Sequence, residues 1–149
     1  FLNKRAEPLL QRLPERQYGL DYGCGPGPVL AMLLREAGHT VRLYDPFFAA
    51  NRSVLWPGYD FITCSEVVEH FHRPHEEFAF LDQLLRPGGC LAVMTSFQTQ
   101  DERFANWSYR RDPTHVTFYK DTTFHVLARL FDWDCEIPRK NVVLLYKQQ

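Results

Sequence analysis

The composition of this 149-residue chain indicates a single globular domain, 1–149, large enough to bury a core without disulfide bonds. Hydrophobic residues make up 45% of the chain and aromatic residues 15%. A net charge of −1 argues against nucleic-acid partners, because it gives no broad positive field. No apolar run approaches the length that crosses a membrane, so we expect no membrane partner either.

The cysteines indicate the cellular compartment, and the first residue bears on whether the sequence is complete at its N-terminus. Cys24, Cys64, Cys90 and Cys135 are scattered and form no C-x-x-C pair, which predicts reduced thiols and a cytoplasmic protein. Because the sequence begins with Phe1 rather than Met, we expect that N-terminal residues are missing.

Residues 1–37 predict a helix, a strand, a glycine turn and a second helix. Leucines among charged residues in 1–16 favour an amphipathic helix that Pro8 starts or interrupts and Pro14 ends. A strand over 18–22 leads into D-x-G-x-G-x-G from Asp21, and a helix over 29–37 follows. This order aims backbone N–H groups at a ligand above the turn. Pro28 stands where a dinucleotide fingerprint needs a small residue, which argues against that fold.

Residues 40–97 continue the alternation of strands and helices, with one gap. A strand over 40–45 is followed by 46–58, too short for the usual further helix and strand, although 53–56 could be a stub of that strand. A strand over 59–65 leads into a short helical stretch over 66–71 and a helix over 76–86. Pro87-Gly88-Gly89 should end that helix before a buried strand over 91–97.

Residues 98–147 predict an insertion and a closing unit. The stretch 98–120 is polar and aromatic, and such an insertion after a strand is where open α/β sheets build ligand sites. Its aromatic side chains could form the core of a lid or a substrate wall, and Arg110-Arg111 could grip an anion or lie in solvent. Asp121 should cap a helix over 121–131, and strands over 133–137 and 141–147 follow, joined by 138–140.

These segments, taken in order, resemble the class I S-adenosylmethionine (SAM)-dependent methyltransferases over about residues 18–97. The glycine turn resembles motif I, Asp45 the acid after the second strand, 59–66 the fourth strand, and 84–93 the helix, Pro-Gly-Gly turn and fifth strand. The resemblance implies a Rossmann-like α/β fold, mostly parallel with a C-terminal antiparallel strand, in which the third-strand region is shortened.

The resemblance also implies the residues that hold SAM. The glycines would let the backbone pass the methionine moiety, Asp21 would orient the loop, and Asp45 would accept hydrogen bonds from the ribose hydroxyls. Phe47 and Phe48 would flank adenine or pack on the sheet edge, and Cys24 would be a small packed residue rather than a nucleophile. The expected cofactor-binding set is Asp21, Gly23, Cys24, Gly25, Gly27, Asp45, Pro46, Phe47, Ser65 and Glu66.

The implied activity is methyl transfer from SAM, and we expect the acceptor to be an oxygen of a small or medium-sized molecule. C-S-E-V-V-E-H at 64–70 is similar to a segment of ubiquinone-pathway O-methyltransferases. A catalytically inactive SAM- or nucleotide-binding module is the alternative, and the shortened region after Asp45 is its support. The sequence leaves the acceptor and the oligomeric state open.

A divalent metal site is a further hypothesis, on Glu66, Glu69, His70 and His115. On a helix the first three would project from one face, and carboxylates with imidazoles suit Mg²⁺, Mn²⁺ or Zn²⁺. E-x-x-E-H with a distant histidine resembles the metal site of small-RNA 2′-O-methyltransferases. Without a metal, His115 or His70 could act as general base. Solvated carboxylates and a packed histidine are the alternative.

Overall fold

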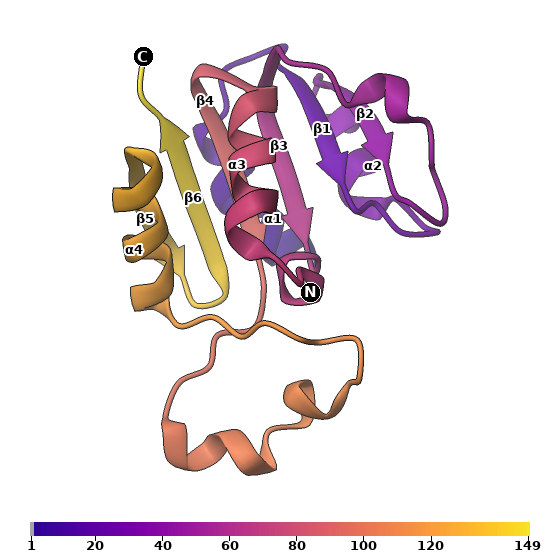
Figure 1. Cartoon of the computed structure of the whole chain (residues 1–149). Coiled ribbons are helices and arrows are strands. Elements are labelled where there is room, and N and C mark those ends of the chain that lie inside the picture. Colours follow the sequence, from indigo (N-terminus) through magenta and orange to yellow (C-terminus); the bar gives the residue numbers. More distant parts are fainter. Residues whose placement is uncertain (1) are drawn as a thin grey trace.

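The computed structural model describes residues 2–149 and contains one six-stranded sheet (Figure 1). The strands lie in the order β2-β1-β3-β4-β6-β5. Neighbours among β2, β1, β3 and β4 run parallel, whereas β6 is antiparallel to both β4 and β5. This arrangement confirms the predicted α/β fold. The strands are β1 (Tyr18–Tyr22), β2 (Thr40–Tyr44), β3 (Tyr59–Ser65), β4 (Leu85–Met94), β5 (Trp133–Arg139) and β6 (Val142–Lys147).

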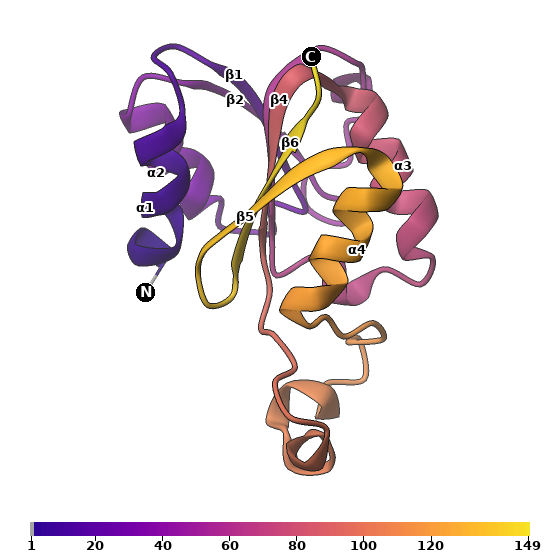
Figure 2. The ribbon, with the colours of Figure 1, turned by 90° about the vertical axis from the view of Figure 1, so that its left-hand side faces the viewer.

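Helices cover both faces of the sheet, so its central strands are apolar runs. Helices α1 (Leu2–Arg12) and α2 (Val29–Glu36) lie on one face, and α3 (Pro74–Leu84) and α4 (Asp121–Phe131) on the other (Figure 2). The two faces have separate cores, one containing Leu9 and Leu34 and the other Phe78 and Phe124, all fully buried. A strand buried from both sides cannot alternate polar and apolar residues, as β3 and β4 illustrate.

Helix α1 contains Pro8 in its interior, so the expectation that this proline starts or interrupts the helix is wrong. Pro8 has no N–H and therefore leaves the carbonyl of Lys4 without its partner in the helix. Arg139 supplies that partner, because its Nη1 donates to the Lys4 carbonyl at 2.8 Å. The guanidinium of Arg12 also binds Glu136 at 2.7 Å. A tertiary contact thus replaces the missing hydrogen bond, and the helix ends before Pro14 as predicted.

The segment between β2 and β3 is shortened as predicted, but it holds no stub of a strand. A single 3₁₀ turn, Arg52–Val54, occupies it, and the Asn51 side chain accepts from the backbone N–H of Ser53 at 3.1 Å. This local bond favours a turn over an extended strand. Strand β2 consequently lies at one edge of the sheet.

Several predicted boundaries move where tertiary pairing overrides local signals. Strand β4 begins at Leu85, which pairs with Tyr59, so Pro87-Gly88-Gly89 lies inside an irregular strand rather than after a helix. The same strand ends at Met94 instead of residue 97. Asp121 is the first residue of α4 and not its cap, because the preceding Lys120 donates its N–H to the hydroxyl of Thr123 at 3.0 Å.

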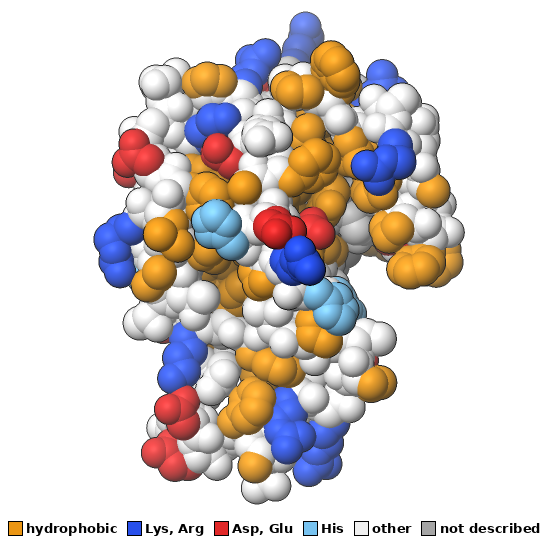
Figure 3. Space-filling model, viewed as in Figure 1, with side chains coloured by type: hydrophobic (Ala, Val, Ile, Leu, Met, Phe, Trp, Pro, Cys, Tyr) orange, Lys and Arg blue, Asp and Glu red, His pale blue; other side chains and the backbone are white. Residues whose placement is uncertain are grey.

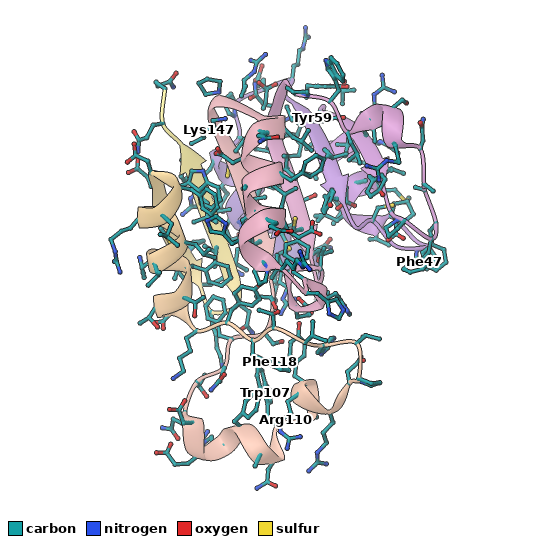
Figure 4. The ribbon with its side chains drawn as sticks, viewed as in Figure 1. Phe47, Tyr59, Trp107, Arg110, Phe118 and Lys147 are labelled. Carbon is teal, nitrogen blue, oxygen red and sulfur yellow. The ribbon has the colours of Figure 1, made fainter. Side chains whose placement is uncertain are left out.

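The insertion, residues 95–120, extends beyond the carboxyl ends of the parallel strands (Figure 1). It carries two 3₁₀ helices, Asp101–Asn106 and Ser108–Arg111. Trp107 and Phe118 lie against each other inside it, with ring centroids 5.9 Å apart (Figure 4). Lys120 binds Asp101 at 2.7 Å, which ties the end of the insertion to its first half. In residues 2–149, no helix combines the length and apolarity needed to cross a bilayer.

Candidate active site

A cavity of about 790 Å³ lies at the carboxyl ends of β1, β2 and β3, next to the insertion. On the space-filling surface the molecule is hollowed between the hydrophobic tip of the loop after β2 and the insertion (Figure 3). Every residue of the predicted cofactor-binding set lines this cavity except Asp21 and Gly27. The remaining lining residues are Val67, His70, His72, Pro113, Thr114 and Val116.

The glycine turn is shaped by backbone contacts with β2. The N–H groups of Gly23 and Cys24 both donate to the carbonyl of Tyr44, at 2.7 and 3.1 Å. Gly23 and Gly25 have φ values of +85° and +68°, which side-chain-bearing residues rarely adopt. A Cβ at Gly23 would lie 2.3 Å from the side chain of Val67, whereas one at Gly25 would meet no atom within 4 Å. The Gly25 position therefore faces open space at the cavity.

Asp45 holds the glycine turn and the loop after β2 together. One carboxylate oxygen accepts from the N–H of Gly25 at 2.9 Å, and the other from the N–H groups of Phe47 and Phe48 at 2.9 and 3.2 Å. The residue is only 8% exposed. Phe47, by contrast, is 87% exposed at the tip of this loop (Figure 4), so it is not packed on the sheet edge. Its ring is free to cover a ligand in the cavity.

Asp21 lies behind the turn and does not line the cavity. It is 3% exposed, and one carboxylate oxygen accepts from the Thr63 hydroxyl at 2.9 Å. Burial raises the pKa of Asp21 to about 6, and the hydrogen bond from Thr63 only partly offsets that rise. The Asp21 carboxyl therefore loses its proton closer to neutral pH than an exposed aspartate does, and its place beneath the turn makes it a support of the site.

Glu66 is not helical, so the prediction that Glu66, Glu69 and His70 share one helix face is wrong. Only 68–70 form a 3₁₀ turn, and Glu66 has a φ of +56°. This left-handed conformation turns the chain sharply after β3. The backbone N–H of Glu66 donates to the carbonyl of Met94 at 2.8 Å. Its carboxylate instead faces helix α1 and the insertion.

The Glu66 carboxylate joins two distant segments of the chain. It forms an ion pair with Arg5 of α1 and accepts from the hydroxyl of Tyr109 at 2.6 Å. Burial tends to raise the pKa of Glu66, but the neighbouring Glu69 carboxyl, the Tyr109 hydroxyl and the Arg5 guanidinium outweigh it and lower that pKa. Sequence reasoning missed both partners. Arg5 gives no local signal, because it lies 61 residues away in the chain.

Glu69 is fully buried below this contact and has one oxygen without a partner. Its Oε1 accepts from the Thr95 hydroxyl at 2.9 Å, whereas Oε2 has no hydrogen bond. Burial, followed by the neighbouring Glu66, raises the pKa of Glu69 to about 7. A buried polar atom without a partner is rare in native proteins, and the carboxylate that carries this one lies next to the histidines of the site.

His70 and His115 meet beside Glu69 although they come from different segments. Their rings are 5.0 Å apart, and ligand atoms of Glu69, His70 and His115 all lie within 4.8 Å of one another. In each ring Nδ1 contacts a backbone carbonyl, that of Thr114 at 2.9 Å for His70 and that of Tyr109 at 2.6 Å for His115. The predicted proximity of His115 is confirmed, but Glu66 is not part of this group.

This geometry defines a class of protein. A mostly parallel sheet with a glycine turn after β1, an acid after β2 and a cavity above both is the arrangement of the class I SAM-dependent methyltransferases. The comparisons agree: a family model described as a methyltransferase domain matches residues 1–136, and the chain belongs to that family. The protein is accordingly a SAM-dependent methyltransferase. A search of curated proteins finds no match.

Solved structures with low sequence identity share the fold. 1,6-Didemethyltoxoflavin-N1-methyltransferase of Burkholderia thailandensis, solved with 1,6-didemethyltoxoflavin and S-adenosylhomocysteine, aligns at a TM-score of 0.73 and 16% identity, covering 99% of this chain and 78% of its own. An O-methyltransferase family protein of the same organism aligns at a TM-score of 0.68 and 14% identity, covering 99% of this chain and 56% of its own. A SAM-dependent methyltransferase of Archaeoglobus fulgidus aligns at a TM-score of 0.67 and 15% identity, covering 98% of this chain and 93% of its own.

Proposed function

We propose that this methyltransferase transfers the methyl group to an oxygen of a small or medium-sized acceptor. The observation that carries the proposal is His70, which lines the cofactor cavity, lies beside His115 and has its Nδ1 bound to the Thr114 carbonyl. With Nδ1 donating there, Nε2 is left as an acceptor for a proton. A hydroxyl needs such an acceptor when it loses its proton, so a histidine here favours oxygen as the atom that is methylated.

The cavity suits SAM in size and in its lining. Gly25 leaves room for close approach of a ligand, since no protein atom would touch a Cβ there. We infer that the methionine end lies by Gly23, Ser65 and Glu66 and the ribose by Asp45, with adenine under Phe47. The Asp45 oxygen that accepts from the N–H of Gly25 keeps a lone pair for a ribose hydroxyl, whereas the other oxygen already accepts from two backbone N–H groups. Asp21 and Gly27 would support the loop.

The chain contributes chiefly alignment. When bound, SAM supplies an electrophilic sulfonium methyl, and the acceptor oxygen must face it in line. His70 would take the acceptor's proton onto Nε2, and His115 would hold the His70 ring in place by edge-on packing. Thr114 and Pro113 of the insertion would close the acceptor side of the cavity. Covering the reacting atoms with the insertion would exclude water.

A divalent ion on Glu69, His70 and His115 is a second candidate, favoured by the partnerless buried oxygen of Glu69. In both histidines Nδ1 contacts a backbone carbonyl, as is usual for metal-binding histidines, and Nε2 of His115 lies 3.6 Å from a carboxylate oxygen of Asp112, which an ion would have to displace. Ligands at ~2.0–2.2 Å from one ion lie at most roughly 4.4 Å apart, so the group would need to contract slightly. When bound, such an ion would supply Lewis acidity at the acceptor hydroxyl.

The first experiment measures cofactor binding and methyl transfer. Calorimetric titration should give binding of SAM and none of NAD, and incubation of SAM with hydroxyl-bearing acceptors should give methylated products by mass spectrometry. His70→Asn should lower the rate of methyl transfer by roughly 100-fold or more, whereas His125→Asn, which changes an exposed histidine on α4, should leave it unchanged. Binding without transfer to any acceptor in a broad panel would favour the inactive module, and transfer only to nitrogen would refute O-methylation.

The metal is tested separately. If an ion is needed, exhaustive chelation should stop turnover and added Mn²⁺, Mg²⁺ or Zn²⁺ should restore it. Activity that survives both chelation and Glu69→Ala would exclude the ion from the mechanism. We also infer a cytoplasmic location and a small-molecule acceptor. All four cysteines of the chain are free thiols, which supports a reducing compartment.

A further inference from the structure

A second cavity, of about 450 Å³, lies between the insertion and the turn that joins β5 to β6, and the cofactor cavity shares none of its lining residues. Its walls include the rings of Phe97, Phe104 and Trp107. Two cations, Arg103 and Lys140, also line it. Aromatic walls with convergent charged groups are the usual composition of a small-molecule site.

The two sides of this cavity are held together by the fold. On the sheet side, the Asn141 carbonyl accepts from the N–H of Thr95 at 3.2 Å, and its side chain accepts from the N–H of Phe97 at 2.8 Å. These bonds fix the β5–β6 turn, and hence Lys140, next to the start of the insertion. The cavity is therefore built from two segments that hydrogen bonds hold together, rather than from one loop.

The insertion side of the cavity is held by aromatic rings that pack against one another. Phe104 lies with its ring centroid 5.2 Å from that of Phe118 and 6.2 Å from that of Trp107. Trp107 in turn stacks on Tyr109, with centroids 5.2 Å apart at an interplanar angle of 28° (Figure 4 shows Trp107 and Phe118). The indole that faces the cavity is thus pre-oriented, which lowers the entropic cost of binding a flat ligand against it.

The charges of the lining leave an excess of positive charge. Asp101, close by in the chain, is already paired with Lys120, so it does not neutralise the cavity. Within residues 2–149 neither Arg103 nor Lys140 forms an ion pair, and Glu102 is the one acid that lines the cavity. Two cations against one carboxylate favour an anionic ligand.

We propose that this second cavity binds a planar aromatic carboxylate, with its ring against Trp107 and Phe104 and its carboxylate between Arg103 and Lys140. The aromatic walls favour a flat ring, and the guanidinium provides paired donors that match a carboxylate. The site is distinct from the cofactor cavity, and its occupancy does not depend on which atom the enzyme methylates. Tyr109 lies between the two sites, because its ring stacks on Trp107 and its hydroxyl reaches Glu66.

The test compares three probes of the same shape and different charge: 2-naphthoate, 2-naphthalenemethanol and 2-naphthylmethylamine. Calorimetry should show naphthoate binding at least about tenfold tighter than the other two, with affinity falling as salt rises. In ¹⁵N spectra of the wild-type protein, naphthoate should shift the Trp107 indole and the Asn106 side-chain amide, both at the cavity. Trp107→Phe assigns the indole signal.

Variants then assign the charge preference. Arg103→Gln with Lys140→Gln should weaken naphthoate binding about tenfold, which corresponds to about 1.4 kcal/mol. Arg111→Gln, an exposed cation of the same insertion that does not line the cavity, should change it less than twofold. Equal binding of the three probes, shifts confined to the Gly23–Gly25 turn, or unchanged affinity in the double variant would each overturn the proposal. If the double variant does not fold, the affinities of the three probes for the wild-type protein and the ¹⁵N shifts that naphthoate causes still test the proposal.

Discussion

Replacing Asp21 with asparagine should stabilise the ligand-free protein at neutral pH. The carboxyl is 3% exposed, and burial raises its pKa from 3.8 to about 6. Because the folded pKa lies above the unfolded one, the folded state binds the extra proton between these values, and the free energy of unfolding falls as pH rises through that window. At about 1.36 kcal/mol for each unit of pKa, the loss is at most about 3 kcal/mol at pH 7.5. Asparagine has no such charge, and its oxygen still accepts from Thr63.

Urea unfolding of wild type and Asp21→Asn at pH 4, 5, 6 and 7.5 measures the effect. The two proteins should be nearly equal at pH 4, and the variant should be more stable by about 1–3 kcal/mol at pH 7.5. Asp134→Asn, which alters an exposed aspartate of β5, should follow the wild type throughout. A difference that does not vary with pH, or a wild type that is the more stable protein at pH 7.5, would refute burial as the cause of the raised pKa of Asp21.

Two further substitutions test the cavity and its closure. Gly25→Ala should fold, and its left-handed conformation should lower the free energy of unfolding by about 1–2 kcal/mol. The variant should bind SAM at least tenfold more weakly by calorimetry, because its Cβ points into open space at the cavity. Unchanged affinity would show that the cofactor does not lie over this turn. Tyr109→Phe removes the hydroxyl that reaches Glu66 and Thr95, so trypsin should cut faster at Arg110 and Arg111. Tyr146→Phe is the matched control, and equal cutting of all three proteins would show that this hydroxyl does not hold the insertion.

Local sequence signals predicted the sheet and the conformation of the glycine turn well. The glycine turn needs positive φ at Gly23 and Gly25, and such positions are visible in sequence because only glycine adopts them readily. The position of Asp45 beside that turn could be predicted, because the ends of the neighbouring parallel strands β1 and β2 lie at the same edge of the sheet. The shortened segment after β2 was evident from its length alone.

The acceptor side could not be predicted in the same way, because it depends on contacts between distant residues. Glu66 leaves the helical conformation to meet Arg5 and Tyr109, and no periodicity encodes that choice. Glu69 was predicted to share a helix face with Glu66 and His70, but it lies in a 3₁₀ turn and is fully buried. The start of β4 was misplaced for a similar reason, since Pro87-Gly88-Gly89 is a turn signal that pairing with β3 overrides.

The contact between Arg139 and the Lys4 carbonyl has a consequence for how the chain assembles during synthesis. The two residues are 135 positions apart, so α1 lacks the donor that completes it around Pro8 until nearly all of the sheet has been made. At ~5–20 residues per second, that interval is roughly 7–27 s. Until then the apolar side of α1, with Leu9, has no finished surface to pack on, because its core also includes Val142 and Leu144 of β6. Helix α1 therefore leaves the ribosome before the sheet that it packs on and is among the last of these elements to dock.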